Sequence, residues 1–120
     1  MAANRILVVD DDPQVLKLIS QMLKRGGYDV STASSGRVVL QSIATSRPDL
    51  VILDLSMPEP DGFEVLKRLR EREPGLPVLV ISGFLGGPML RAAELFGAAA
   101  TLRKTDVPEM LLATVRRIVP

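Results

Sequence analysis

The sequence predicts an α/β protein, a doubly wound sandwich in which a five-stranded parallel sheet lies between two layers of helices. Short apolar runs recur along the chain; they are continuous and rich in β-branched residues, which is typical of strands buried on both faces. Segments with helical periodicity separate these runs, so strands and helices alternate. The 120 residues contain no repeat or low-complexity linker, and we expect a single domain over residues 1–120.

Five segments are expected to form the strands of this sheet. The strongest are Ile6–Val9, Leu50–Leu53 and Val78–Ile81, which are apolar throughout. Two weaker candidates, Tyr28–Ala33 and Ala99–Arg103, contain more polar residues. We therefore expect these two segments nearer the edges of the sheet.

The first helix has clear signals at both of its ends. Asp12 is a suitable N-cap, Pro13 fits the first helical position, and Gly26-Gly27 supplies the stop. Its apolar residues recur with the helical period and are expected to face the core: Val15, Leu16, Ile19, Met22 and Leu23.

Four further helices are expected, one after each remaining strand. They run from about Arg37 to Thr45, from near Asp61, and from Met89 to Phe96, and the last opens at Asp106. Asp106 and Glu109 have the spacing of a capping box, with a proline between them. The apolar positions of these helices that should face the core include Val39, Leu40, Ile43, Phe63, Leu66, Leu69, Leu111, Val115 and Ile118.

Composition excludes several classes of function. Without cysteine the chain has no disulfide, thiol nucleophile or thiolate metal site, and without histidine it lacks the usual general base and zinc ligand. The net charge of +1 gives no reason to expect that this chain alone binds nucleic acid or a membrane surface. No apolar run approaches the roughly 20 residues that span a bilayer, and no signal peptide follows Met1. We expect a cytoplasmic protein.

Reactive side chains stand where the predicted strands end. The first strand runs into Asp10-Asp11-Asp12, the third into Asp54 and the fourth into Ser82, while the weak fifth strand leads to Lys104. Asp12 is assigned to helix capping. Because the carboxyl ends of parallel strands meet at one edge of the sheet, the remaining side chains should converge there.

This set of groups predicts a phosphoryl-transfer site with an aspartate as acceptor. Carboxylates that lie close together raise one another's pKa, and a hard cation such as Mg²⁺ relieves that repulsion. An ionised Asp54 can then act as a nucleophile toward phosphorus. Lys104 and the Ser82 hydroxyl would stabilise charge on the transferring phosphoryl oxygens.

Four segments of the chain resemble the receiver domain of response regulators in two-component signalling. Ile6–Pro13 is similar to the opening of that domain, and Asp49–Pro58 followed by Asp61-Gly62 is similar to its phosphorylation segment. Pro77–Gly83 and Gly97–Lys104 match its fourth strand and its lysine region. The resemblance covers essentially the whole chain. It implies a flavodoxin-like sheet of order 2-1-3-4-5.

The resemblance also implies a metal site and a partner. Asp11 would bind Mg²⁺ directly, Asp10 mainly through water, Asp54 by its carboxylate, and Ser56 by its backbone carbonyl. The phosphoryl donor would be the phosphohistidine of a sensor histidine kinase or a histidine phosphotransfer protein. The absence of histidine from this chain agrees with a separate donor.

The same resemblance implies the roles of the catalytic residues. Asp54 would be the phosphoacceptor, Ser82 would hydrogen-bond the phosphoryl group, and Lys104 would pair with a phosphoryl oxygen. Phe84 would either shield the phosphoryl group from water or lie partly exposed in its loop.

Two positions depart from the family pattern. Thr101 stands where the family usually has an aromatic residue that turns inward on activation. Thr105 follows Lys104, where the family usually has a proline in a cis peptide. Because a cis bond before a non-proline residue costs roughly 3–4 kcal/mol, we expect a trans bond with a shifted loop, or a strained turn.

The leading functional hypothesis is a phosphorylatable receiver that acts as a switch or relay and passes its signal to a downstream effector or through a homodimer. We do not expect an enzyme that acts on a separate substrate, because hydrolases of the aspartyl-phosphate type usually have a second acidic residue where this chain has Ser56. The alternative is a receiver-like interaction module that no longer switches. Thr101 and Thr105 motivate that alternative, whereas the complete acidic set and Lys104 argue against it.

Overall fold

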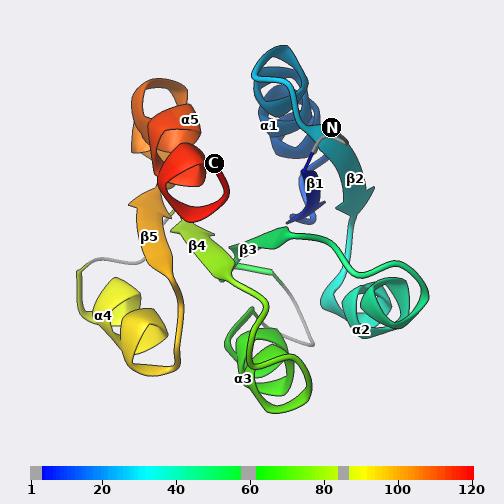
Figure 1. The fold of residues 1–120 in the computed structure, drawn as a ribbon. Helices are drawn as coiled ribbons and strands as arrows, with labels where there is room; N and C mark the ends of the chain where they lie inside the picture. Colours follow the sequence, from blue (N-terminus) through cyan, green and yellow to red (C-terminus); the bar gives the residue numbers. More distant parts are fainter. Residues whose placement is uncertain (1–3, 58–61, 84–86) are drawn as a thin grey trace.

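The computed structural model describes residues 4–57, 62–83 and 87–120. A parallel sheet of five strands, in the order β2-β1-β3-β4-β5, runs through the middle of the molecule, with helices on both of its faces (Figure 1). This confirms the predicted doubly wound α/β sandwich and its strand order.

The strands follow the predicted apolar runs closely. The strong runs form the three inner strands, and the two weaker candidates lie at the sheet edges, as expected. Their bounds are β1 (Arg5–Val9), β2 (Asp29–Ala33), β3 (Leu50–Asp54), β4 (Val78–Ser82) and β5 (Ala100–Arg103). Every residue of β3 and β4 is buried, which explains why these strands read as unbroken apolar runs.

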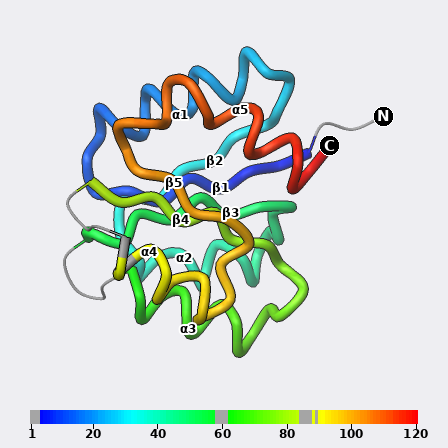
Figure 2. Tube along the Cα trace, turned by 90° about the vertical axis from the view of Figure 1, so that its left-hand side faces the viewer, coloured from blue at the N-terminus to red at the C-terminus, as the bar shows by residue number. Residues whose placement is uncertain are grey.

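Within the described residues, five α-helices and one short 3₁₀ helix connect and follow the strands. They are α1 (Pro13–Arg25), α2 (Gly36–Thr45), α3 (Gly62–Arg72), α4 (Gly87–Leu95), the 3₁₀ helix η1 (Lys104–Asp106) and α5 (Val107–Ile118). Helices α1 and α5 cover one face of the sheet, and α2, α3 and α4 cover the other (Figure 2). No helix among these residues is long and apolar enough to cross a membrane.

The helix ends were predicted with mixed success. Asp12 caps α1 as expected, its carboxylate accepting a hydrogen bond from the Gln14 N–H at 2.9 Å. Helix α2 begins one residue before the prediction, and α4 begins two residues before it and ends one residue earlier. The predicted start of the third helix at Asp61 lies outside the described residues.

The capping box predicted at the start of α5 is wrong. Asp106 is the last residue of η1, with φ −92° and ψ −7°, and its side chain makes no capping hydrogen bond. An N-cap residue normally has an extended backbone, which aims its side chain at the first free N–H groups of the helix. The 3₁₀ turn fixes Asp106 in a helical conformation instead and so prevents this geometry.

The sheet divides the hydrophobic core into two clusters. One lies between the sheet and helices α1 and α5, and it includes Ile52 of β3. The other lies between the sheet and helices α2, α3 and α4, and it includes Leu53, the next residue of the same strand. The expected core positions of the helices lie in these clusters, either buried or packed partly buried against them.

Candidate functional site

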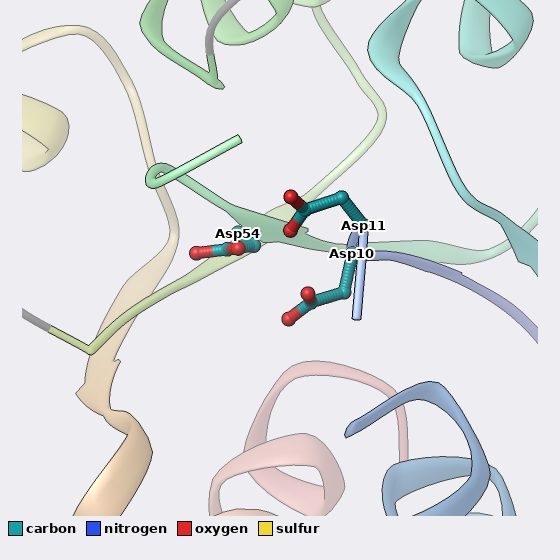
Figure 3. Close-up of side chains that lie close together, drawn as sticks. All are labelled: Asp10, Asp11 and Asp54. Atoms are coloured by element: carbon teal, nitrogen blue, oxygen red, sulfur yellow. The ribbon is translucent and has the colours of Figure 1, made fainter. Parts of the chain in front are cut away.

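Two neighbouring inner strands bring the acidic residues together. β1 pairs with β3 in parallel, with Val9 opposite Leu53, so Asp10 and Asp54 leave the sheet side by side. Asp10 and Asp54 are fully buried, whereas Asp11 is exposed. One carboxylate oxygen from each of the three lies within 4.8 Å of the other two. Figure 3 shows Asp10 and Asp11, at the end of β1, beside Asp54 at the end of β3.

Backbone N–H groups hold the two buried carboxylates in place. Asp10 Oδ1 accepts a hydrogen bond from the Asp12 N–H, and Asp54 Oδ1 accepts one from the Ser56 N–H, each at 2.9 Å. In both cases the donor lies two residues further along the chain, in the turn after the strand. The turns therefore fix the orientation of each carboxylate and leave its second oxygen facing the site.

Lys104 bridges those second oxygens. Its Nζ lies 3.2 Å from Asp10 Oδ2 and 3.3 Å from Asp54 Oδ2. Burial opposes the charged form of Lys104, but the charges of Asp54 and Asp10 outweigh burial and raise the pKa of its ammonium group. Thr105, which follows Lys104, does not keep that lysine from the site. No described non-glycine residue has a positive φ, and this includes the residues of the turn after Lys104.

Asp10 is a buried carboxyl group in surroundings that disfavour its charged form. Burial raises its pKa from 3.8 to about 6, and the negative charge of Asp54 acts in the same direction. The Asp12 N–H and Lys104 oppose this rise without cancelling it. At this site three carboxyl groups thus lie near one lysine ammonium group.

A divalent cation fits this arrangement of donors. Asp10 Oδ2 is buried and accepts no hydrogen bond from any residue that the structure describes, although Lys104 lies near it. Carboxylate oxygens from Asp10, Asp11 and Asp54 converge, and oxygen is the ligand type that hard cations prefer. The cluster therefore could bind a metal ion.

Ser82 lies at the same edge of the sheet. Asp54 pairs with Ile81 of β4, so Ser82 is one residue beyond the partner of Asp54, and it is 1% exposed. Ser56 is partly buried, and its Oγ has no hydrogen-bond partner within residues 4–57, 62–83 and 87–120. The other expected contributor near the site, Phe84, lies outside the described residues.

Sequence reasoning did not anticipate how closely α3 approaches the site. A Cβ atom on Gly62, the first residue of α3, would lie 2.5 Å from the carbonyl oxygen of Asp54 and would also overlap Leu55 Cα. Only glycine permits this approach of helix and strand. The Asp61-Gly62 pair in the sequence was the available signal, but by itself it indicates only a turn.

Comparison with known proteins gives a consistent result. The response regulator receiver domain family matches residues 6–116. The response regulator MprA of Mycolicibacterium vanbaalenii is 41% identical over 114 residues, which are 95% of this chain and 49% of that protein. The alkaline phosphatase synthesis transcriptional regulatory protein PhoP of Bacillus subtilis is 44% identical over 79 residues, 66% of this chain and 33% of that protein. This chain spans about half or less of the length of these relatives.

Solved structures show the same relationship. The chemotaxis protein CheY4 of Vibrio cholerae superposes with a TM-score of 0.90 at 32% identity, covering 98% of this chain and 100% of that chain. The BeF3-activated receiver domain of RstA from Klebsiella pneumoniae gives 0.89 at 32% identity, covering 96% and 97%. The chain therefore belongs to the receiver domains of two-component response regulators, which are signalling domains, and its acidic site fits their phosphoacceptor switch role.

Proposed function

We propose that Asp54 accepts a phosphoryl group from the phosphohistidine of a sensor histidine kinase or a histidine phosphotransfer protein, and that the domain acts as a switch or relay. The observation that carries this proposal is the buried Asp54 carboxylate between Asp10, Asp11 and Lys104. One Asp54 oxygen is oriented by the Ser56 N–H and the other by the Lys104 ammonium, as a nucleophile in a fixed pose requires.

The proposed step exchanges one bond to phosphorus for another. A lone pair of an Asp54 carboxylate oxygen forms the new O–P bond, while the P–N bond to the donor imidazole breaks and its electron pair stays on the imidazole. Lys104 then pairs with a phosphoryl oxygen in place of Asp54 Oδ2, and the Ser82 hydroxyl donates a hydrogen bond to another. Both contacts stabilise the charge that spreads over the phosphoryl oxygens in the transition state.

Mg²⁺ is the proposed cofactor of this step. Asp10, Asp11 and Asp54 would hold it with their carboxylates, and Ser56 with its backbone carbonyl. When bound, the ion supplies positive charge against the phosphoryl oxygens and relieves the repulsion among the three carboxylates. The raised pKa of Asp10 supports this assignment, because burial and the negative charge of Asp54 disfavour its charged form and a bound cation would favour it.

Two further roles follow from the same proposal. The domain catalyses only its own phosphorylation and dephosphorylation, because the acceptor is its own side chain. Phosphorylation adds negative charge and acceptor oxygens where β1, β3 and β4 end, and can bias the helices that follow toward a second arrangement. A downstream effector, or a second copy of the chain, would respond to that change.

The test is a mass measurement after incubation with Mg²⁺ and acetyl phosphate. The parent and Asp49→Asn should gain the mass of one phosphoryl group, and Asp54→Asn should gain none. Asp49 is a matched control because it is an aspartate next to β3 at the opposite end of the sheet. A parent that neither gains mass nor binds beryllofluoride in the presence of Mg²⁺ would contradict the proposal and leave a receiver-shaped interaction module.

A further inference from the structure

A groove lies between strand β2 and helix α2, away from the acidic site. β2 is at one edge of the sheet, and α2 lies below it in Figure 1, on the face that α3 and α4 also cover. The groove has a volume of about 520 Å³, within the range of roughly 300–1,000 Å³ that is typical of ligand sites. Neither the three clustered aspartates nor Lys104 lines it.

One wall of the groove is a single stripe of α2. The residues of this stripe are three or four positions apart, which places them on one side of the helix: Val38, Gln41, Ser42 and Thr45. The core side of α2 carries the buried residues Val39 and Ile43 instead. Val38 remains 42% exposed, although it is apolar. This side of α2 is therefore available for a ligand.

The opposite wall includes the backbone of β2 at its free edge. The Asp29 N–H donates to the Asn4 carbonyl, so the backbone groups of Asp29 and of every second residue after it point toward β1. The backbone groups of Val30 and Thr32 point the other way, where none of the described strands pairs with β2. Both residues line the groove, although the Val30 side chain packs against the core on the other face of the sheet. The groove thus reaches β2 through its backbone.

The inner surface and one end of the groove are formed by groups that are held in place. Leu7 and Pro48, which line it, are both buried. Arg5 lines the end near the start of β1, and its guanidinium is fixed by hydrogen bonds to Ser46 Oγ and the Arg47 carbonyl. The groove is therefore a shaped site whose walls need little ordering when a ligand binds.

The groove is close to neutral in charge. Of the described residues that line it, only Arg5 and Asp29 are charged, and they have opposite signs. These two residues are partners in the β1–β2 register, so their charges lie at the same end of the groove. The other polar groups of its lining side chains are hydroxyls and one amide. Charge complementarity thus favours a neutral ligand over an acidic or a basic one.

We propose that this groove binds a neutral, extended segment of another protein, which adds to the free edge of β2 as an additional strand. The backbone of the segment would pair with the free N–H and C=O groups of Val30 and Thr32. Every second side chain of the segment would enter the groove between β2 and α2. This inference goes beyond the phosphoacceptor function and does not depend on it, because the groove shares no residue with the acidic site.

The free backbone groups favour an extended chain over a compact small molecule. An edge strand presents its N–H and C=O groups at the regular spacing of another strand, and strand addition uses that row for affinity. The hydroxyl and aliphatic groups beside the row would select small or β-branched neutral side chains, such as those of serine, threonine and valine. A compact molecule would fill the groove but leave the row of backbone groups unpaired.

The experiment uses a set of short capped peptides in which valine or alanine alternates with threonine, serine or asparagine. Each peptide is titrated into the full chain while the amide NMR signals are recorded. Peptides of the set should shift the signals of β2 and α2, and hydrogen exchange at the Val30 and Thr32 amides should slow when they bind. The same peptides with every amide N-methylated should not bind, because N-methylation removes their backbone donors.

Two pairs of variants test the edge and the groove separately. Thr32→Pro removes a free N–H and should weaken peptide binding by about 2- to 12-fold, the range for one hydrogen bond, while Thr32→Ala keeps the N–H and should bind as the parent does. Ser42→Leu fills the groove and should also weaken binding. Ala44→Leu is its matched control, because Ala44 is exposed on the same helix but does not line the groove. Denaturant unfolding checks that each variant folds, and the Ser42→Leu pair decides the result if Thr32→Pro does not.

Each outcome either supports or overturns strand addition. Weaker binding in Thr32→Pro and Ser42→Leu, but in neither control, supports it. The proposal is overturned if no peptide of the set binds, if the N-methylated peptides bind equally well, or if binding leaves exchange at Val30 and Thr32 unchanged. A dimer in sedimentation that Thr32→Pro abolishes would assign the edge to a second copy of the chain and would also overturn it. None of these results bears on phosphorylation of Asp54, which the mass measurement tests.

Discussion

Charged side chains are arranged in opposite ways at the two ends of the sheet. At the carboxyl end, Asp10 and Asp54 are buried and share one lysine. At the other end, the Arg5 N–H donates to Asp49 Oδ2 at 2.7 Å, and the Asp49 N–H donates to the Arg5 carbonyl at 2.7 Å. Both Arg5 and Asp49 are exposed.

At the amino end, the Arg5 side chain also has hydrogen-bond partners. Its guanidinium donates to Ser46 Oγ at 2.6 Å and to the Arg47 carbonyl at 2.7 Å, which ties the end of α2 to β1. The charged side chains of Arg5 and Asp49 are exposed and hydrogen-bonded to neutral groups, and these contacts are structural. At the carboxyl end burial and like charge work against folding, and such unfavourable placement is typical of a site that is kept for binding or catalysis.

Glycine-to-alanine substitutions should give the largest difference in the free energy of unfolding between the two ends of the sheet. Gly62→Ala at the site should cost on the order of 2–4 kcal/mol in the free energy of unfolding, because its Cβ would overlap the backbone of Asp54 and Leu55. Gly75→Ala near the opposite end, where the nearest atom is Arg47 Nη2 at 3.7 Å, should change it by less than about 1 kcal/mol. Urea denaturation measures both, and equal effects would contradict the close approach of α3.

Neutralising one aspartate at each end should change stability with opposite sign. Without metal at neutral pH, Asp10→Asn should raise the free energy of unfolding by on the order of 2 kcal/mol, because it removes a buried charge next to Asp54. Asp49→Asn should lower it by up to about 1 kcal/mol, because it weakens the acceptor of the Arg5 N–H. Denaturation in EDTA tests both; a loss of stability in Asp10→Asn would refute the asymmetry.

The increase in the free energy of unfolding that we expect for Asp10→Asn should depend on pH. The pKa of Asp10 is raised from 3.8 to about 6 in the folded protein, so folding favours its protonated form. That stabilising contribution is complete below pH 3.8 and is lost as the pH rises through about 6. The stability difference between Asp10→Asn and the parent should therefore be near zero at about pH 3.5 and reach its full value by about pH 7. Denaturation of both proteins across this range is the measurement, and a difference that shrinks with rising pH would reverse the assigned sign.

The smallest change in the free energy of unfolding is expected at the exposed Arg47–Glu73 ion pair, near the amino end of the sheet. Arg47 Nε lies 2.9 Å from Glu73 Oε1, but the two side chains are 50% and 30% exposed. Water and salt screen such a pair, so Glu73→Gln should change the free energy of unfolding by less than about 0.5 kcal/mol. Thermal unfolding at low and high salt checks this, and a loss above 1 kcal/mol would mean that this end carries more electrostatic stabilisation than we assign to it.

The sequence allowed the sheet and most of the site to be predicted because both depend on local patterns. Burial on both faces produces unbroken apolar runs, and parallel strands that end together bring Asp10, Asp11 and Asp54 to one edge. The double pairing of Lys104 was not predicted, because it depends on how far its side chain reaches once η1 has turned the chain.

Contacts between distant segments were beyond sequence reasoning for the same reason. Nothing local to Gly62 indicates that the backbone of Asp54 lies against it, and nothing local to Phe96 indicates its packing on Phe63. The capping box at Asp106 failed because the local pattern was correct but the preceding residues had already formed a 3₁₀ turn. Tertiary structure decided each of these cases.

The division of the core by the sheet makes adjacent residues report on different halves of the molecule. Ile52 and Leu53 are consecutive in β3, yet the first packs toward α1 and α5 and the second toward α2, α3 and α4. Methyl labels on this pair would give two spectroscopic probes one peptide bond apart, each sensitive to one layer. A signal that starts at Asp54, the next residue of the strand, could thus be followed into either layer separately.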